Sequence, residues 1–286
     1  MTSHSRSISF EGVDNVRDLG GLPTSDGRVI IPGLIFRGAA LHSITDSDAR
    51  VLSEQLHIST IVDLRCGYER EAKPNRQVPG AEQVWIPLFD EDEVGIDYFK
   101  PVEGTHAIGN DFACDQIDFY RALANPLTAG QMKKALHTIF NQASQGKPVY
   151  YHCSGGKDRA GTISLLVLSV LGVDRKHILD DYLLTNASRD KALNSVFERF
   201  LRLSDGNEEL AHELTMLHRA RKEHLQAFEE AVIENYGSID TFMRDQLGIT
   251  DNLCAEWRAS CTMLLHELEN TRVTYRPAAR ARVAAL

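Results

Sequence analysis

The chain has 286 residues, of which 43% are hydrophobic and 25% are charged. This composition is that of an ordinary globular protein and excludes a disordered or fibrous class, so we expect a single elaborated domain over 1–286. The formal net charge of -9 argues against nucleic-acid binding through a basic face, and phosphate recognition must therefore be local.

The sequence contains no run that predicts export or membrane insertion. The N-terminal residues MTSHSRSISF lack an apolar stretch of signal-peptide length, and the longest apolar run, 163–173, is too short to span a bilayer. We therefore expect a cytoplasmic protein, with secretion without a recognisable signal peptide as the alternative. The five cysteines are odd in number and form no CxxC pair, so the sequence predicts neither a disulfide framework nor a metal site, and no cofactor is expected.

Four short apolar segments in the first third of the chain predict β-strands. The segments 29–31 and 34–37 are rich in β-branched residues and are separated by Pro-Gly. The segment 59–64 is continuously apolar, which is typical of a central strand covered on both faces, and 84–88 predicts a further strand.

Helical patterns alternate with these strands. Thr45 and Asp48 form a capping box that predicts a helix start, and apolar residues at helical spacing predict another helix over 131–144. The acid-, Gly- and Pro-rich segment 90–115 has no period and predicts a long irregular loop. From residue 174 onward the pattern is mostly helical.

The segment around Cys153 is the strongest chemical signal in the sequence. Residues 148–152 (PVYYH) predict a strand that runs directly into CSGGKDRAG, and 162–171 is apolar on all sides, which predicts a buried helix. The whole chain therefore predicts an α/β fold in which helices flank a central, mostly parallel sheet.

This strand, loop and helix would suit a cysteine nucleophile. A cysteine attacks as the thiolate, which unpaired loop amides and a helix N-terminus can stabilise, and Gly155 and Gly156 let the loop curl. Arg159 completes a C-x5-R spacing and could grip two phosphate oxygens while Cys153 becomes a transient phosphocysteine. The bare spacing also occurs around structural cysteines, but the predicted strand and buried helix on either side favour the phosphatase hypothesis.

The sequence resembles the superfamily of cysteine-dependent tyrosine and dual-specificity phosphatases, and more closely the bacterial group typified by mycobacterial protein tyrosine phosphatase B. The resemblance extends from about residue 15 to about residue 265. Besides HCSGGKDRAG, it is carried by NVRDLGG (15–21), FRGAAL (36–41), VDLR (62–65), DDYLLTN (180–186) and YGSIDTFMRDQLGIT (236–250).

The resemblance implies roles for individual residues. Cys153 would be the nucleophile, Arg159 the phosphate-binding arginine, and His152 the residue that tunes the thiolate. The phosphate-binding loop would comprise Ser154, Gly155, Gly156, Lys157, Asp158 and Arg159.

The family also needs an aspartic acid that protonates the leaving group. The candidates are Asp63, Asp90, Asp92, Asp97 and Asp158. We favour Asp90, because it follows a predicted strand in a Pro-x-x-Asp sequence as the family's acid does. Asp158 is the rival, although its neighbour Arg159 would hold its carboxylate ionised.

Other matching residues are expected to support the site. Asp63 and Arg65 would brace the end of a central strand, and Asn15, Arg17 and Asp18 would support the loop from below. The chain departs from many relatives at Ala160, where they have Ser or Thr, so hydrolysis of the phosphocysteine could be slow.

The helical segment 189–221 corresponds to a lid in this bacterial group, although a fixed helical subdomain also fits its pattern. The expected substrate is a phosphotyrosine protein. A phosphoinositide is the alternative, because Lys157 adds a second cation to the loop. A phosphate-binding pseudophosphatase and a sulfurtransferase are further alternatives.

Overall fold

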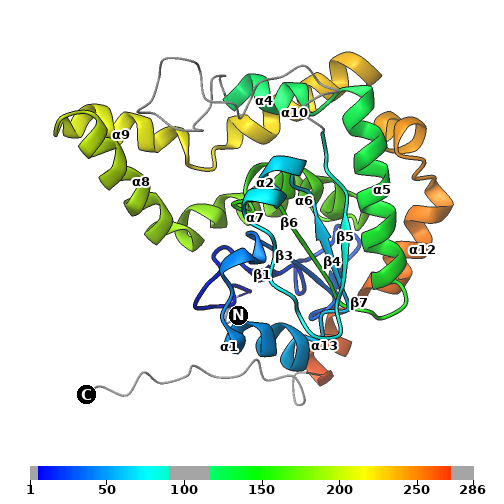
Figure 1. Ribbon diagram of the computed structural model, residues 1–286. Helices are drawn as coiled ribbons and strands as arrows, with labels where there is room; N and C mark the ends of the chain where they lie inside the picture. The colour runs from blue at the N-terminus through cyan, green and yellow to red at the C-terminus, as the bar shows by residue number, and fades with distance from the viewer. Residues whose placement is uncertain (1–5, 90–115, 272–286) are drawn as a thin grey trace.

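A five-stranded sheet forms the centre of the computed structural model, which describes residues 6–89 and 116–271 (Figure 1). The strands lie in the order β1-β3-β6-β4-β5, and β1 runs antiparallel to β3 whereas the other neighbours are parallel. Their bounds are β1 Arg17–Asp18, β3 Ile35–Gly38, β6 Val149–His152, β4 Thr60–Asp63 and β5 Glu82–Trp85. The prediction of an α/β fold with a mostly parallel sheet is confirmed.

The register of the parallel strands places their carboxyl ends side by side. Gly38 of β3 and Asp63 of β4 both pair with His152 of β6. Because parallel strands end at the same edge of a sheet, the segments that follow these three strands converge there. Cys153 is the first residue beyond that edge of β6.

Helices cover both faces of the sheet. Consecutive strand residues point to opposite faces, so Val149 and Tyr151 belong to one core cluster while Tyr150 belongs to the other. The larger cluster takes in apolar residues of α5, α6, α10 and α12, and the smaller takes in residues of α1 and η2. This burial on both faces explains why the segments read as continuous apolar runs.

The helices follow the strands along the chain. Before the gap in the described residues they are η1 Leu41–Ser43, α1 Asp46–Arg50, η2 Val51–Gln55 and α2 Gly67–Ala72. After it they are α4 Gln116–Ala122, α5 Pro126–Ala143, α6 Asp158–Val170, α7 Arg175–Ser188, α8 Asp190–Leu203, α9 Glu208–Leu217, α10 Lys222–Tyr236, α11 Ile239–Thr241, η3 Phe242–Gln246, α12 Asp251–Cys261 and α13 Leu265–Thr271. A two-stranded antiparallel sheet pairs β2 Arg28–Ile30 with β7 Thr262–Leu264.

The expected boundaries needed three corrections. The capping box of Thr45 and Asp48 is present, but α5 begins five residues earlier than expected, at Pro126, because Asn125 caps it. β5 ends before Pro87, which has no N–H to continue the ladder, so the strand begins two residues and ends three residues earlier than expected. α6 begins at Asp158, four residues before the apolar segment 162–171 that predicts it.

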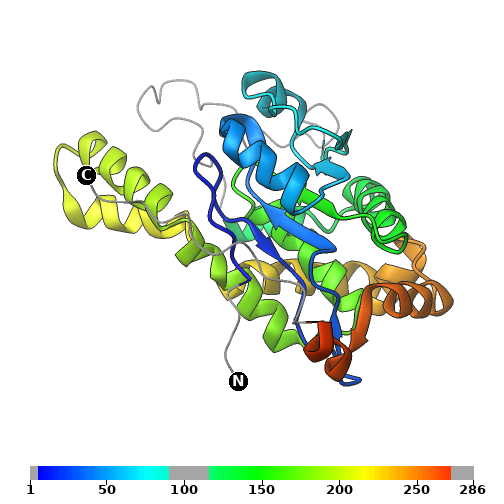
Figure 2. The same ribbon diagram turned by 90° about the horizontal axis from the view of Figure 1, so that it is seen from below.

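The pair α8–α9 projects away from the sheet and its flanking helices, as both views show (Figures 1 and 2). It fills most of the segment 189–221, and its role as a lid stays a prediction. The expected loop 90–115 lies outside the described residues. Across residues 6–89 and 116–271, each helix is either too short or too polar to cross a membrane.

Candidate active site

The loop from Cys153 to Lys157 joins β6 to the buried helix α6. Cys153 is buried, with an exposed fraction of 2%. Gly156 has a φ of +66°, and a Cβ at this position would lie 2.4 Å from the carbonyl carbon and oxygen of Gly38. The loop can therefore follow this path only with glycine at position 156.

The carbonyl oxygens of the loop all accept hydrogen bonds from groups outside its centre. The Cys153 carbonyl accepts from His152 Nδ1 at 3.0 Å, and the Ser154 carbonyl accepts from the Ala40 amide at 3.1 Å. Asn15 Nδ2 donates to the carbonyls of both Gly155 and Gly156 at 3.0 Å. Fixing the carbonyls outward directs the opposite side of each peptide unit, its N–H, toward the centre, as an anion-binding loop requires.

A buried ionic network holds in place the residues that bind the loop carbonyls. Asp181 of α7 accepts from Arg17 Nε at 3.2 Å and from Arg37 Nη1 at 3.0 Å. Arg37 Nη2 in turn donates to the Gly156 carbonyl at 2.9 Å, and Arg17 Nη1 donates to Asn15 Oδ1 at 2.5 Å. Burial alone would raise the pKa of Asp181, but the surrounding arginines hold it well below its ordinary value.

Two members of this network were missed from the sequence, although both lie in motifs that carry the resemblance. Arg37 belongs to FRGAAL and Asp181 to DDYLLTN. Asp18, in contrast, accepts from the amides of Gly20 at 2.7 Å and Gly33 at 2.6 Å. It therefore stabilises a turn beside β3 and does not contact the loop itself.

Arg159 projects from the first turn of α6 and pairs with Glu69 of α2. Its Nη2 donates to Glu69 Oε1 at 2.8 Å, and its Nη1 donates to Glu69 Oε2. Glu69 also accepts from Ser154 Oγ and, at 2.8 Å, from Cys66 Sγ. The Arg159 guanidinium lies over the ring of Phe89, with 5.5 Å between Cζ and the ring centroid.

The charges of this pair reinforce each other. Burial alone would raise the pKa of Glu69, but Arg159 and the bonds from Cys66 and Ser154 lower it to about 2. Burial alone would lower the pKa of Arg159, whereas Glu69 raises it well above its ordinary value. Both groups are therefore ionised at neutral pH, and Glu69 is the functional residue that the sequence analysis missed most clearly.

Lys157 does not present a free cation to the centre of the loop. Its Nζ donates to Gln116 Oε1 at 3.3 Å and to the His218 carbonyl at 3.2 Å, and it lies 3.3 Å from Asp158 Oδ1. The side chain thus joins the phosphate loop to α4 and to the turn after α9.

A chain of buried hydrogen bonds leads away from Asp158. Tyr120 OH donates to Asp158 Oδ1 at 2.9 Å, and Tyr120 OH lies 2.6 Å from Tyr182 OH, which lies 3.2 Å from His224 Nδ1. Burial alone would raise the pKa of Asp158, but Lys157 and the Tyr120 bond lower it below its ordinary value. A carboxylate held ionised in this way is poorly suited to donate a proton to a leaving group.

Residues at and just after the end of β4 lie next to His152, which precedes the loop. Arg65 pairs with Asp63 through Nε at 2.9 Å and Nη2 at 2.7 Å. Asn75 Nδ2 donates to Asp63 Oδ2 at 3.2 Å and lies 2.9 Å from His152 Nε2. Burial lowers the pKa of His152, so the ring is neutral and Nε2 can accept from Asn75 while Nδ1 donates to the Cys153 carbonyl. Asp63 and Arg65 contact each other and Asn75 here, and their supporting role stays a prediction.

Our preferred general acid, Asp90, lies outside the described residues, as do Asp92 and Asp97. Cys66, Cys153, Cys254 and Cys261 are free thiols. Within the two described ranges, no group of three or more His, Cys, Asp or Glu residues is placed to hold a metal ion.

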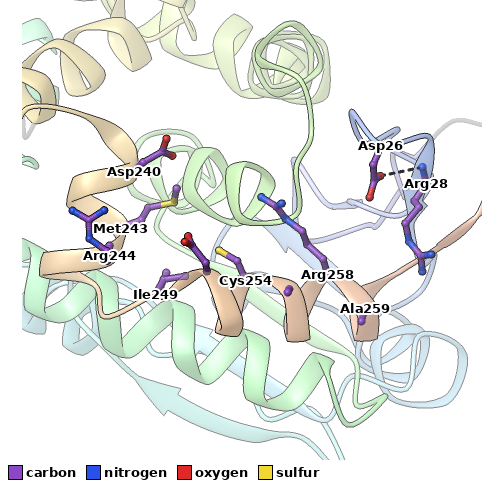
Figure 3. A pocket seen from close by; sticks show the side chains of 11 residues that line it. Asp26, Arg28, Asp240, Met243, Arg244, Ile249, Cys254, Arg258 and Ala259 are labelled. Atoms are coloured by element: carbon purple, nitrogen blue, oxygen red, sulfur yellow. Dashed lines mark hydrogen bonds between the residues drawn. The ribbon is translucent and has the colours of Figure 1, made fainter.

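A separate pocket of about 770 Å³ lies along α12 and contains no residue of the phosphate loop (Figure 3). The three arginines that line it already have partners. Arg258 donates through Nε to the Val170 carbonyl, Arg28 donates to Thr262 Oγ1 at 2.7 Å, and Arg244 pairs with Asp245 at 2.8 Å. These arginines are therefore engaged within the protein.

A cysteine after a central parallel strand, an outward-anchored glycine loop and an arginine on the next helix together define the class of cysteine-dependent phosphatases. Residues 8–263 match the model of the tyrosine phosphatase family, and the chain belongs to that family. The protein is therefore a phosphatase.

Two curated proteins are similar over most of their length. The triple specificity protein phosphatase PtpB of Mycobacterium tuberculosis is 28% identical over 262 residues, which cover 82% of this chain and 91% of that protein. A putative tyrosine-protein phosphatase of Cupriavidus necator is 28% identical over 248 residues, which cover 85% of this chain and 84% of that protein.

Two solved structures also align. The core catalytic domain of the PP-IP phosphatase SIW14 from S. cerevisiae gives a TM-score of 0.35 at 14% identity, covering 73% of this chain and 96% of that chain. TpbA of P. aeruginosa gives a TM-score of 0.31 at 14% identity, covering 66% and 89%.

Proposed function

We propose that the protein is a protein-tyrosine phosphatase that works through a phosphocysteine at Cys153. The observation that carries this proposal is the position of Cys153, which is buried at the start of a loop whose carbonyls are fixed outward and which leads into α6. The loop amides and the positive end of α6 would stabilise both the thiolate and a bound phosphoryl dianion.

In the first step, Cys153 Sγ attacks phosphorus and the P–O bond to the tyrosyl oxygen breaks. The leaving phenolate takes a proton from a general acid, for which Asp90 remains our choice because Asp158 is held ionised by Lys157 and Tyr120. In the second step, water attacks the phosphocysteine, which releases inorganic phosphate and restores the thiolate.

Arg159 would stabilise the charge on the transferring phosphoryl group. Both of its terminal nitrogens donate to Glu69 in this structure, so binding of a phosphate requires the guanidinium to share or rearrange these bonds. Glu69 would then act as a positioning residue that keeps the guanidinium oriented and close to the loop between turnovers.

The hydrolysis step lacks one group that many relatives have. Ala160 is fully buried on the first turn of α6 and offers no hydroxyl to the sulfur. The nearby Thr162 hydroxyl donates to the Asp158 carbonyl at 3.1 Å. We therefore expect release of the thiolate, rather than its attack on the substrate, to limit turnover.

The site favours phosphotyrosine over a phosphoinositide. The lipid hypothesis rested on Lys157 as a second cation, and this side chain is 3% exposed and bound to Gln116, Asp158 and the His218 carbonyl. A second phosphate would have to break these contacts to reach it, whereas a phosphotyrosine needs none of them broken.

The test compares turnover of a phosphotyrosine peptide with that of vesicles containing a monophosphorylated phosphoinositide, using the wild type and Cys153→Ser. We expect higher kcat/KM for the peptide and loss of both activities in the variant. Turnover of the lipid with none of the peptide would refute the proposal. A catalytically silent wild type that still binds the peptide would identify a pseudophosphatase.

A further inference from the structure

A second guanidinium, that of Arg189, lies against Gly155 of the phosphate loop. A Cβ built on Gly155 would lie 3.0 Å from Arg189 Cζ and 3.2 Å from each of its terminal nitrogens. The guanidinium therefore packs on the loop backbone two residues beyond Cys153. The side chain is only partly buried, so one side of it remains open to solvent.

The backbone that carries Arg189 is tied to the same framework as the loop. Arg189 lies between α7 and α8, and its amide donates to the Thr185 carbonyl at 3.0 Å. Thr185 Oγ1 accepts from Arg17, and Asn186 exchanges two hydrogen bonds with the Ala220 backbone at 2.8 and 2.9 Å. These bonds fix the end of α7, so a ligand of Arg189 would meet a largely preorganised group.

Arg189 lies close enough to Asp158 to help lower the pKa of that carboxyl, so its charge is partly compensated. The described residues place no carboxylate within ion-pair distance of it, and the loop carboxylate Asp158 is already bound by Lys157 and Tyr120. Its field reaches across the loop: burial lowers the pKa of Lys157, and Arg189 lowers it further. In a chain with a net charge of -9, a partly exposed cation of this kind attracts an anion locally.

The C-x5-R spacing already assigns one arginine, Arg159, to the phosphoryl group. Arg159 belongs to the first turn of α6, whereas Arg189 lies between α7 and α8 and packs on Gly155. A planar guanidinium at a partly open rim matches a carboxylate, which it can bind through two parallel hydrogen bonds.

We propose that Arg189 forms a subsite for an acidic side chain that neighbours the phosphotyrosine in the substrate peptide. The proposal rests on the tyrosine phosphatase function proposed above and adds a substrate preference to it. A glutamate or aspartate beside the phosphotyrosine would bind Arg189, while its neutral amide analogue would not gain this contact.

The test uses two phosphotyrosine peptides that differ only by Glu or Gln beside the phosphotyrosine, and a third with Lys there. For the wild type we expect kcat/KM to be about fivefold higher with Glu than with Gln, the size expected of a partly exposed ion pair. In Arg189→Ala this ratio should fall to about one, and in Arg189→Glu the Lys peptide should become the best of the three. Arg50→Ala, which removes an exposed positive charge on α1, should keep the wild-type ratio.

Three results would overturn the inference. A Glu-to-Gln ratio that is unchanged in Arg189→Ala would show that Arg189 binds no peptide carboxylate. An equal loss with both peptides would show that Arg189 acts on the phosphoryl group being cleaved. A wild type that turns over none of the peptides but hydrolyses a phosphoinositide would refute the proposed tyrosine phosphatase function, and the inference with it.

Discussion

Glu69 shows how a single side chain prepares the site before substrate arrives. Its carboxylate binds both terminal nitrogens of Arg159, the Ser154 hydroxyl and the Cys66 thiol. An arginine buried to this extent would be costly without a counter-charge, because removing one partner of a buried pair leaves the other charge uncompensated. Glu69 therefore determines where Arg159 lies in the absence of phosphate.

We expect Glu69→Ala to lower kcat/KM for an aryl phosphate by about 10- to 100-fold, the range of effects seen when the support of a catalytic group is removed. The physical reason is that Arg159 loses its fixed orientation. Steady-state kinetics would measure the loss, and Glu71→Ala, which changes an exposed glutamate in the same helix α2, should stay near the wild type. Equal activity of the two variants would show that Arg159 is oriented by other contacts.

At the scale of elements, α7 supports the phosphate loop through hydrogen bonds that begin at Asp181. Asp181 joins Arg17 of β1 to Arg37 of β3, and Arg37 donates to the Gly156 carbonyl. Residues of β1, β3 and α7 thus form one network that fixes the Gly156 carbonyl of the loop. The whole network is buried, so each charge depends on the others for its stabilisation.

Replacing Asp181 with Asn should lower the free energy of unfolding by about 3 to 5 kcal/mol, because two buried guanidinium groups lose their counter-charge. Urea denaturation would measure the difference. Asp180→Asn is the matched control, since Asp180 is exposed on the same helix and pairs with Lys176. A surface pair of that kind contributes about 0 to 1 kcal/mol. Similar stabilities for the two variants would contradict the account of Asp181.

The elements around Cys153 could be predicted from the sequence because their signals are local. An apolar strand, a Gly-Gly turn and a helix that is apolar on all sides occupy consecutive residues, and the structure places β6 and α6 there. Glu69 could not be found in this way. It lies 90 residues from Arg159, in a short charged helix whose sequence has no apolar period. The two residues come together only because the parallel strands that precede them end at the same edge of the sheet.

At the scale of the whole molecule, two buried or partly buried histidines affect how stability depends on pH. His218 follows α9 and His224 lies in α10. Burial and the charge of Lys157 lower the pKa of His218 and of His224 to about 4. In the unfolded chain these groups take up protons near pH 6.5. Below that pH the unfolded state binds more protons than the folded state, so stability falls as the pH decreases from about 6.5 to about 4.

The free energy of unfolding should therefore be lower at pH 5 than at pH 7.5, as urea denaturation would show. Burial raises the pKa of Asp18 to about 6 and the pKa of Glu229 above its ordinary value, which acts in the opposite direction. Burial also lowers the pKa of His42 and of His152, which adds to the effect of His218 and His224. His224→Gln should show a smaller decrease between the two pH values than the wild type, whereas the exposed His212→Gln should match the wild type. The same decrease in all three proteins would rule out His224 as a source.

The central claim concerns a covalent bond, and trapping that bond tests it most directly. Wild-type protein is mixed with a phosphotyrosine peptide and quenched in acid during turnover, and the digested protein is analysed by mass spectrometry. We predict one phosphoryl group on the peptide that contains Cys153, with accumulation because Ala160 leaves the hydrolysis step unassisted, and none in Cys153→Ser. Hydrolysis that persists in Cys153→Ser, or a phosphoryl group on another residue, would contradict the mechanism.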